Sequence, residues 1–337
     1  MKKIDSANVV ITGAAGFLGG RAAKYFAENS VNNTIIATAR KTKRKDELEA
    51  HGCQFIEGDL LSPAFCHDLT KDTDILVHCA ALSSPFGNYS AFYDSNFLAT
   101  KYLLDASIKN GVKKFIFIST PSIYFDFNDR FNVKESDLLP SPLVNHYATT
   151  KLFAEQYVLE ANGKQIQTIA LRPRAIIGAE DTVIFPRILV AYNKGKLKII
   201  GNGKNTCDFT CVRNVIEAIN CSINAPVSSY GQAYNITDGT PLLFWESLNY
   251  VLTALDLVPP SKKVPLSVAL FAAGLVEMKS RLFKSSKEPS LTKYGVGILA
   301  KSMTLDISKA KKQLNYIPVM TTHEGINEYI EWYKNQK

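Results

Sequence analysis

A tyrosine and a lysine four residues apart form a pair suited to proton transfer. Tyr147 and Lys151 have the i, i+4 spacing that places two side chains on one face of a helix. A free tyrosine has a pKa of about 10, so it needs a neighbouring positive charge to exchange a proton at neutral pH. Lys151 can supply that charge, and its N–H donors can also hold a ribose. We therefore expect proton transfer at Tyr147 beside a bound ribose.

Hydroxyl side chains follow an apolar run that precedes this pair. Residues 115–118 are apolar, and Ser119, Thr120 and Ser122 come directly after them. In parallel sheets, ligands bind at the carboxyl ends of the strands. We expect these hydroxyls to lie in the same site as Tyr147.

Three glycines near the start of the chain predict a turn that holds a phosphate. An apolar run at residues 9–11 leads into Gly13, Gly16 and Gly19, and a helical stretch at 21–29 and a second apolar run at 34–38 follow. A strand, a glycine turn and a helix bring the pyrophosphate of a dinucleotide against the helix N-terminus. The spacing is GxxGxxG, and its position between a strand and a helix favours this interpretation over an ordinary loop.

The residues after the second strand distinguish two dinucleotides. An acidic residue there hydrogen-bonds the ribose of NAD, whereas an arginine accommodates the additional phosphate of NADP. The sequence has Arg40, with Lys41 and Lys43 beside it and no acidic residue. This favours NADP with Arg40 as the phosphate contact, and NAD stays as the alternative. Arg44 and Lys45 are expected to begin the next helix in solvent.

Asp59 follows a third expected strand at residues 54–56. At that strand end it is placed to accept a hydrogen bond from the adenine amino group. An ordinary turn aspartate is the alternative interpretation.

Short apolar runs recur along the first half of the chain and alternate with helix-like segments. They lie at residues 9–11, 34–38, 54–56, 75–79, 115–118 and 168–171. Runs that are apolar on both faces predict a parallel sheet covered by helices on each side. The expected fold is α/β, a Rossmann-type doubly wound parallel sheet with a smaller C-terminal substrate-binding lobe. We place the cofactor domain at 1–175, with 208–238 returning to it, and the interleaved lobe at 176–337.

Composition excludes several classes of protein. The 337 residues are 46% hydrophobic and 21% charged, which is typical of a soluble globular chain and excludes one that is mainly disordered. The six cysteines show no CxxC or His-linked spacing, so neither a disulfide framework nor a metal site is predicted. Polar residues interrupt the apolar stretch near the N-terminus, so we expect no secretory signal and a cytoplasmic location.

Motifs along nearly the whole chain resemble those of the extended short-chain dehydrogenase/reductase superfamily. They comprise the glycine turn, residues 58–60, 78–81 and 96–100, the Ser119-Thr120 strand end, Tyr147 with Lys151, residues 171–173, and the segments 306–310 and 314–318. The resemblance implies that Tyr147 is the acid/base and that Lys151 orients the nicotinamide ribose. It also gives Thr120, four residues before Tyr124, the role of the usual serine that binds the substrate oxygen, with Ser119 and Ser122 as alternatives.

The same resemblance implies further residues near the cofactor. Residues of the turn and of the strand ends are expected to contact it: Phe17, Leu18, Leu60, Ala80, Ala81 and Pro173. Asn96 either serves the site or only ties the backbone near the cofactor.

The second lobe distinguishes the branches of this superfamily. Sugar-nucleotide members resemble one another in an Arg-Asp pair whose arginine holds the diphosphate, and in a later Arg-x-Gly-Asp/Glu segment. Here Cys207 precedes Asp208 and the later segment is absent from the sequence, so charge-assisted contacts for a diphosphate are missing. Residues 289–299 resemble instead the 3β-hydroxysteroid dehydrogenase branch and its bacterial relatives that reduce 2-alkyl-3-oxoalkanoates.

We therefore predict an NADP(H)-dependent oxidoreductase that acts on a secondary alcohol or ketone of a small hydrophobic molecule. The first alternative is a nucleotide-sugar 4-epimerase or dehydratase with tightly bound NAD, which would need another diphosphate ligand such as Arg187 or Lys204. The second is a redox-sensing regulator that binds dinucleotide without turnover. Helices at 93–110 and 151–162 commonly form a dimer seam in the superfamily, so a homodimer is expected.

The net charge of +8 gathers in two segments. Residues 40–45 hold five basic side chains, and residues 262–287 hold six against the single acid Glu277. These segments lie beside the expected cofactor phosphate and around an apolar stretch, so we expect no nucleic-acid partner. The stretch 266–276 is too short to span a bilayer. It is either an amphipathic helix that touches anionic lipid and admits a lipid-like substrate, or a buried lobe helix with a solvated basic end.

Overall fold

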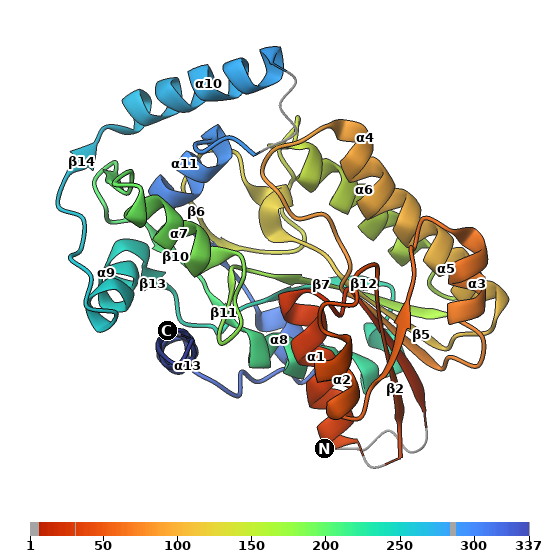
Figure 1. Cartoon of the computed structure of the whole chain (residues 1–337). Helices are drawn as coiled ribbons and strands as arrows, with labels where there is room; N and C mark the ends of the chain where they lie inside the picture. The colour runs from red at the N-terminus through yellow and green to blue at the C-terminus, as the bar shows by residue number, and fades with distance from the viewer. Residues whose placement is uncertain (1–6, 31, 284–287, 337) are drawn as a thin grey trace.

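Seven parallel strands form the central sheet. They are β1 (Asn8–Thr12), β2 (Thr34–Ala39), β3 (Gln54–Glu57), β4 (Ile75–His78), β5 (Lys114–Ile118), β7 (Gln167–Pro173) and β12 (Gln232–Ile236). Their order is β12-β7-β5-β4-β1-β2-β3, so successive strands run outward in both directions from the boundary between β1 and β4 (Figure 1). This arrangement confirms the expected doubly wound sheet, and it places the ligand-binding crevice at the carboxyl ends of β1 and β4.

The computed structural model describes residues 7–30, 32–283 and 288–336. Residues 1–6, on which part of the expectation of no secretory signal rested, lie outside the described part. Lys284 and Lys287 of the basic segment also lie outside it.

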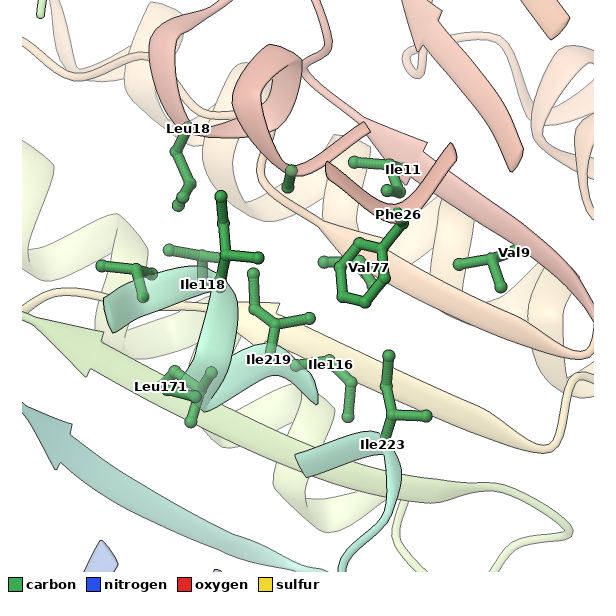
Figure 2. Close-up of a cluster of buried hydrophobic side chains, with 14 of the residues drawn as sticks. Val9, Ile11, Leu18, Phe26, Val77, Ile116, Ile118, Leu171, Ile219 and Ile223 are labelled. Carbon is green, nitrogen blue, oxygen red and sulfur yellow. The ribbon is translucent and has the colours of Figure 1, made fainter. Parts of the chain in front are cut away.

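Helices cover both faces of the sheet because its strands are apolar on both sides. One face carries α1 (Phe17–Asn29), α8 (Val212–Ile223) and α12 (Ser308–Gln313), and the other carries α3 (Pro63–Leu69), α5 (Ala99–Lys109) and α6 (His146–Glu160). The shorter elements of this part of the chain include α2 (Lys45–Ala50), α4 (Tyr89–Phe92), a π-helical turn at Tyr93–Leu98 and a 3-10 turn at Pro121–Tyr124. Figure 2 shows Phe26 of α1 and Ile219 of α8 packed over Val77 and Ile116 of the strands.

A second, smaller group of elements forms the lobe. Its strands are β6 (Arg130–Val133), β8 (Ile176–Ile177), β9 (Ile199–Ile200), β10 (Thr206–Cys207), β11 (Thr210–Cys211), β13 (Leu242–Leu243), β14 (Lys263–Val264) and β15 (Met303–Leu305). Its helices are α7 (Ile184–Asn193), α9 (Phe244–Ala254), α10 (Leu266–Leu282), α11 (Lys293–Ala300) and α13 (Thr322–Lys334). In Figure 1, α10 is the outermost helix, with α11 between it and the rest of the lobe.

The chain crosses between these two groups several times. After β7, β12 returns to the central sheet, as the sequence indicates. Two further crossings occur where the sequence suggests none. The strand β6 lies within residues 1–175 yet pairs with β15 in the small sheet, and α12 lies within 176–337 yet packs on the central core. The assignment of separate cofactor and substrate roles to these parts stays a prediction.

One face of α6 is turned toward the sheet and carries charge. Tyr147, Lys151 and Glu155 are spaced i, i+4, i+8, and Lys151 and Glu155 are both buried. Glu155 accepts a bidentate pair of hydrogen bonds from the guanidinium of Arg172 on β7, with Nε to Oε2 at 2.8 Å. The pair is buried on both sides. It therefore joins the helix that carries Tyr147 to the central sheet through a contact that water does not screen.

We predict that breaking this pair destabilises the fold. Glu155→Ala leaves the Arg172 guanidinium buried without its counter-charge, so the free energy of unfolding should fall by about 3–5 kcal/mol in urea denaturation. Glu160→Ala, an exposed position on the same helix, is the matched control and should change stability by less than about 0.5 kcal/mol. A loss at Glu155 no larger than that of the control would contradict the role given to the pair.

Candidate functional site

The glycine turn lies between β1 and α1, where neighbouring backbone leaves no room for larger side chains. Gly13 has φ +71°, and a Cβ there would lie 2.7 Å from the backbone nitrogen of Ala80 at the end of β4. A Cβ on Gly19 would lie 2.4 Å from the carbonyl oxygen of Gly13. A Cβ on Gly16 would meet only that same oxygen, at 3.2 Å. Gly13 and Gly19 therefore allow close packing of the turn, and Gly16 leaves its own surface accessible to a ligand.

The first turn of α1 has the features of an anion site. Phe17, Leu18 and Gly19 are its first residues, and within the described chain no side chain caps this end and no acidic residue lies in the first turn. The first backbone N–H groups of a helix have no intrahelical acceptor and lie at the positive end of its dipole. Together with the open face of Gly16, they suit the pyrophosphate of a dinucleotide.

A buried histidine holds the end of β4 against the turn. The ring of His78 contacts Thr12 Oγ1 through Nδ1 at 2.7 Å and Thr100 Oγ1 through Nε2 at 2.9 Å. Burial, followed by the nearby Lys151 charge, lowers the pKa of His78 to about 3, so the ring is neutral. Because the amide of Ala80 donates to Thr12 Oγ1, we assign the Thr12 hydroxyl as donor to Nδ1 and the ring proton to Nε2. This chain of bonds fixes the strand end beside Gly13.

Asn96 ties neighbouring backbone, which is one of the two roles that the sequence suggests for it. Its Oδ1 accepts the amide of Leu82 at 2.7 Å, and its Nδ2 donates to the carbonyl of Leu82 and to Thr150 Oγ1, both at 3.2 Å. Asn96 lies in the π-helical turn at Tyr93–Leu98. It thus fixes the segment after β4 against α6.

Hydroxyl groups converge around Tyr147. Thr120 follows β5, and its Oγ1 donates to Ser122 Oγ at 3.0 Å, while Ser122 Oγ contacts the hydroxyl of Tyr294 at 2.8 Å. Tyr147 is partly buried, and loss of hydration raises its pKa, which the neighbouring Thr120 and Ser83 hydroxyls lower in part. Hydrogen bonds thus join Thr120, Ser122 and Tyr294 in one line of hydroxyls, and Tyr147 and Ser83 lie near its Thr120 end.

Lys151 is buried, and burial lowers its pKa to about 7, although the charge of Glu155 opposes this shift. Its ammonium donates to the carbonyl of Ile118 at 2.6 Å and lies 3.9 Å from the centre of the Phe117 ring. Both partners belong to β5. Lys151 thus holds α6 against the end of that strand, one residue before Ser119.

The expected cofactor contacts occupy the carboxyl edge of the sheet. Arg40 follows β2 and is exposed, and it makes no hydrogen bond or ion pair with any residue that the structure describes. Asp59 follows β3 and is exposed, with one carboxylate oxygen accepting the amide of Leu61 at 3.0 Å. Leu60 and Pro173 are buried beside the ends of β3 and β7, and Ala80 and Ala81 follow β4. The fold brings these residues to one edge, and their contacts with a cofactor stay predictions.

Arg44 corrects one expectation. The sequence suggests a solvated start to the next helix, whereas the Arg44 guanidinium bonds Glu47 at 2.9 Å and Glu180 at 2.5 Å. It also donates to the carbonyl of Gly16 at 3.3 Å. Glu180 belongs to the lobe and lies far from Arg44 in sequence, so no local pattern could reveal the pair. Lys45, by contrast, is exposed as expected.

The residues present fit a nicotinamide dinucleotide. The turn excludes side chains where a pyrophosphate would approach, α1 offers free N–H groups, and Ser119 Oγ is buried without a hydrogen-bond partner among the described residues. Lys151 and the hydroxyls after β5 lie at the same edge of the sheet. Gly13, Gly16, Phe17, Leu18 and Gly19 would hold the phosphates, and Lys151 would hold the second ribose.

Sequence reasoning missed two hydroxyls of this site. Ser83 lies a few residues beyond β4, and a polar residue after a central strand is a signal that could have found it. Tyr294 reaches the site from α11, 172 residues beyond Ser122. Only the folded chain brings Tyr294 and Ser122 together, so the spacing of residues in the sequence offered no signal for Tyr294.

Comparisons with known proteins show which family the chain resembles. Residues 9–237 match the family model described as "NAD dependent epimerase/dehydratase family". The chain is 35% identical over 296 residues to 3beta-hydroxysteroid-dehydrogenase/decarboxylase isoform 1 of Arabidopsis thaliana, covering 84% of this chain and 67% of that protein. It is 29% identical over 328 residues to 2-alkyl-3-oxoalkanoate reductase of Shewanella oneidensis, covering 94% and 84%. The chain spans about two thirds of the length of the plant relatives that it matches.

A solved structure shares the fold. UDP-glucuronic acid 4-epimerase from Bacillus cereus, in complex with NAD, superposes with a TM-score of 0.76 at 23% identity, covering 97% of this chain and 99% of that one. At this identity the likeness concerns the fold alone.

We predict that His78 makes the stability of the protein depend on pH. The folded pKa of about 3 lies below the ordinary value of 6.5, so below pH 6.5 the unfolded chain takes up a proton that the folded chain refuses. The stabilisation by neutral His78 is complete above pH 6.5 and is lost as the pH falls toward 3, by up to about 1.4 kcal/mol per pH unit.

This contribution can be separated from acid protonation of carboxylates by comparing unfolding free energies across that pH range. His78→Phe removes the titrating ring and should flatten the dependence, whereas His323→Phe, at an exposed position, should leave it unchanged. Parallel curves for the parent and the His78→Phe variant would refute the prediction.

Proposed function

The chain belongs to the NAD dependent epimerase/dehydratase family, and we propose that it reduces a ketone, or forms one, on a small hydrophobic substrate. It is an NAD(P)-dependent enzyme of the extended short-chain dehydrogenase/reductase type. The cofactor that we propose is NADP(H). The observation that carries this proposal is the line of hydroxyls from Thr120 to Tyr294, with Tyr147 near its Thr120 end. This line is a proton-transfer site, and its far end, Tyr294, belongs to an apolar part of the lobe. The bound cofactor would supply or accept the hydride.

The residues beside the hydroxyls favour an apolar substrate. A cluster of buried apolar side chains from four segments contacts this region, and it includes Ile123, Tyr124, Phe125, Val133, Ala148, Met303 and Leu305. The ring of Tyr294 packs edge-on against Phe125, 5.6 Å between ring centres. A hydrophobic substrate gains free energy by leaving water for such surroundings. The named activities of the plant and Shewanella relatives, on a hydroxysteroid and a 2-alkyl-3-oxoalkanoate, agree with this substrate class.

The proton of the reaction is carried by the Tyr147 hydroxyl. In the reducing direction, the phenol of Tyr147 gives its proton to the carbonyl oxygen as that oxygen becomes a hydroxyl. The Thr120 hydroxyl, which donates to Ser122 in this structure, would turn to donate its hydrogen bond to the same substrate oxygen. In the oxidising direction, Tyr147 takes the hydroxyl proton. Burial holds the Tyr147 pKa above its ordinary value, so the phenol form predominates at neutral pH. Lys151, in its ammonium form, would favour the phenolate that remains after proton donation.

The preference for NADP(H) rests on the charges after β2. Arg40 is exposed and has no partner in the described residues, so its guanidinium is available to a phosphate. Arg44 is already engaged by Glu47 and Glu180. Arg40, and not Arg44, is therefore the arginine that we assign to the additional phosphate of NADP.

The sugar-nucleotide alternative finds less support in the lobe. Cys207 takes the place of the arginine that holds a diphosphate, and it is buried in β10. Of the two residues that could serve as the further ligand, Arg187 pairs with Glu288 at 3.2 Å, and Lys204 is exposed just after a turn. The lobe therefore favours a reductase over a sugar-nucleotide enzyme.

Tyr147→Phe should abolish turnover and spare cofactor binding. The variant lacks the hydroxyl that gives the proton, and general acid–base groups typically contribute about 10²–10⁴-fold in rate. NADPH binding, followed by fluorescence titration, should stay within about twofold, because the phenyl ring keeps the packing. Turnover is measured with a panel of hydroxysteroids, 2-alkyl-3-oxoalkanoates and sugar nucleotides. Near-normal activity of the variant would refute the assignment, and turnover of sugar nucleotides alone would refute the substrate class.

Arg40→Ala should weaken NADPH far more than NADH. Loss of a charge-assisted contact to phosphate is worth roughly 1.5–3 kcal/mol, which is about tenfold or more in the dissociation constant. Lys45→Ala, an exposed basic residue at the start of α2, is the matched control and should affect both cofactors little. Equal weakening of NADPH and NADH by Arg40→Ala would remove the cofactor preference from the proposal.

A further inference from the structure

The helix α10 exposes a continuous apolar stripe. Val268, Phe271, Leu275, Met278 and Leu282 are all exposed, with Phe271 at 71% and Leu282 at 77%. Their spacing of three and four residues places them on one face of the helix, over a length of about 21 Å at 1.5 Å per residue. A contiguous exposed apolar patch of this kind marks a site for a partner or a membrane.

The opposite face of α10 is already used. Ala269 and Ala273 are buried, and they pack with Val296 of α11 in one apolar cluster. Gly274 faces Lys293, since a Cβ there would lie 3.0 Å from the Lys293 side chain. Small residues therefore seat α10 on α11, and the large apolar residues are left exposed. In Figure 1, α10 is the outermost helix of the lobe.

The charged side chains of α10 and of the two lysines before it also differ between the inner and the exposed side. The acid Glu277 is turned to α11, where its carboxylate accepts the backbone amide of Lys293 at 2.8 Å. Lys279 is exposed on the helix, and Lys262 and Lys263 are exposed just before it. The exposed side of the segment thus combines a row of large apolar side chains with basic charge, while its one acidic side chain lies on the inner side.

We propose that α10 docks on the surface of an anionic lipid membrane. The apolar stripe would lie among the acyl chains near the headgroups, and the lysines would contact anionic headgroups, as in other amphipathic helices that lie in the membrane plane. No helix in the described part of the chain is both long and apolar enough to cross a bilayer.

The charge pattern favours a membrane over a second copy of the chain. Two copies paired through this stripe would bring their lysines together, with each Glu277 turned inward and bound to α11. Like charges that approach at an interface cost free energy. An anionic surface pairs with the same lysines favourably.

Docking would place the proposed active site close to the membrane. The helix α10 packs on α11, and Tyr294 of α11 contacts Ser122, which in turn accepts a hydrogen bond from Thr120. An open hollow of about 420 Å³ lies along α10, lined in part by Phe271, Met278 and Lys293. Lys293 is the neighbour of Tyr294 in the chain. A short path of contacts thus connects the docked helix with the catalytic hydroxyls.

Vesicle flotation of the full-length chain tests this proposal. We expect the parent to float with phosphatidylcholine vesicles that contain phosphatidylserine, and to bind more weakly to phosphatidylcholine alone or at high salt, because salt screens the lysines. The double variant Phe271→Ser and Met278→Ser should bind roughly tenfold or more weakly, since it loses two apolar side chains that enter the membrane.

Matched variants separate docking from general surface effects. Val227→Ser with Val258→Ser removes two exposed apolar side chains elsewhere, and it should leave flotation unchanged. Lys262→Glu with Lys263→Glu should abolish the preference for anionic vesicles, and Lys311→Glu with Lys312→Glu, exposed on α12, should not. Thermal melts verify that each variant is folded.

Three results would overturn the proposal: no flotation of the parent with anionic vesicles, equal flotation of the parent and the Phe271→Ser/Met278→Ser variant, or a dimer in light scattering that this variant dissociates while flotation persists. The third result would assign the stripe to a second copy. Docking is independent of the reaction, so the Tyr147→Phe variant should float like the parent.

Discussion

The buried face of α6 is the constraint on which the site depends. A helix that carries Tyr147 to a sheet edge must also bury Lys151 one turn later and Glu155 one turn after that. Charges withdrawn from water are tolerated only when partners replace the hydration. Arg172 of β7 and the carbonyl of Ile118, the last residue of β5, provide those partners. The same contacts that make the burial possible therefore fix the position of Tyr147 relative to two strand ends.

The partners also determine how much charge the site retains. Glu155 is bound to Arg172, so it offsets only part of the desolvation of Lys151, whose pKa lies at about 7. His78, close to Lys151, is neutral for the related reason that it is fully enclosed. When the pH is close to the pKa of a lysine, small changes in its surroundings alter its protonation state. A bound ribose and a phosphate group would both favour the protonated form, since each supplies acceptors or negative charge.

The sequence predicts those parts of the molecule that depend on neighbours in the chain. Strand runs, the Gly13 turn and the common face of Tyr147 and Lys151 follow from local spacing, and the structure agrees with the sheet that they imply. Arg44 and Tyr294 were not predicted in their roles because Glu180 and Ser122, which they contact, lie 136 and 172 residues away. Side chains that approach from the lobe are positioned by packing between layers, and no periodicity in the sequence records such contacts.

The helix α10 shows the same limit in a different form. Its sequence is apolar on nearly every side, so the pattern alone left two interpretations, a buried helix and an amphipathic one. The structure resolves the pattern by residue size: the face with Ala269 and Ala273 is buried against α11, and the face with Phe271 and Met278 is exposed. Small residues allow close packing between helices, whereas large ones at the same positions would hold α10 away from α11. The exposed stripe is thus a consequence of the close packing of α10 on α11. The same packing places Lys293 beside α10, and the next residue, Tyr294, reaches the hydroxyls.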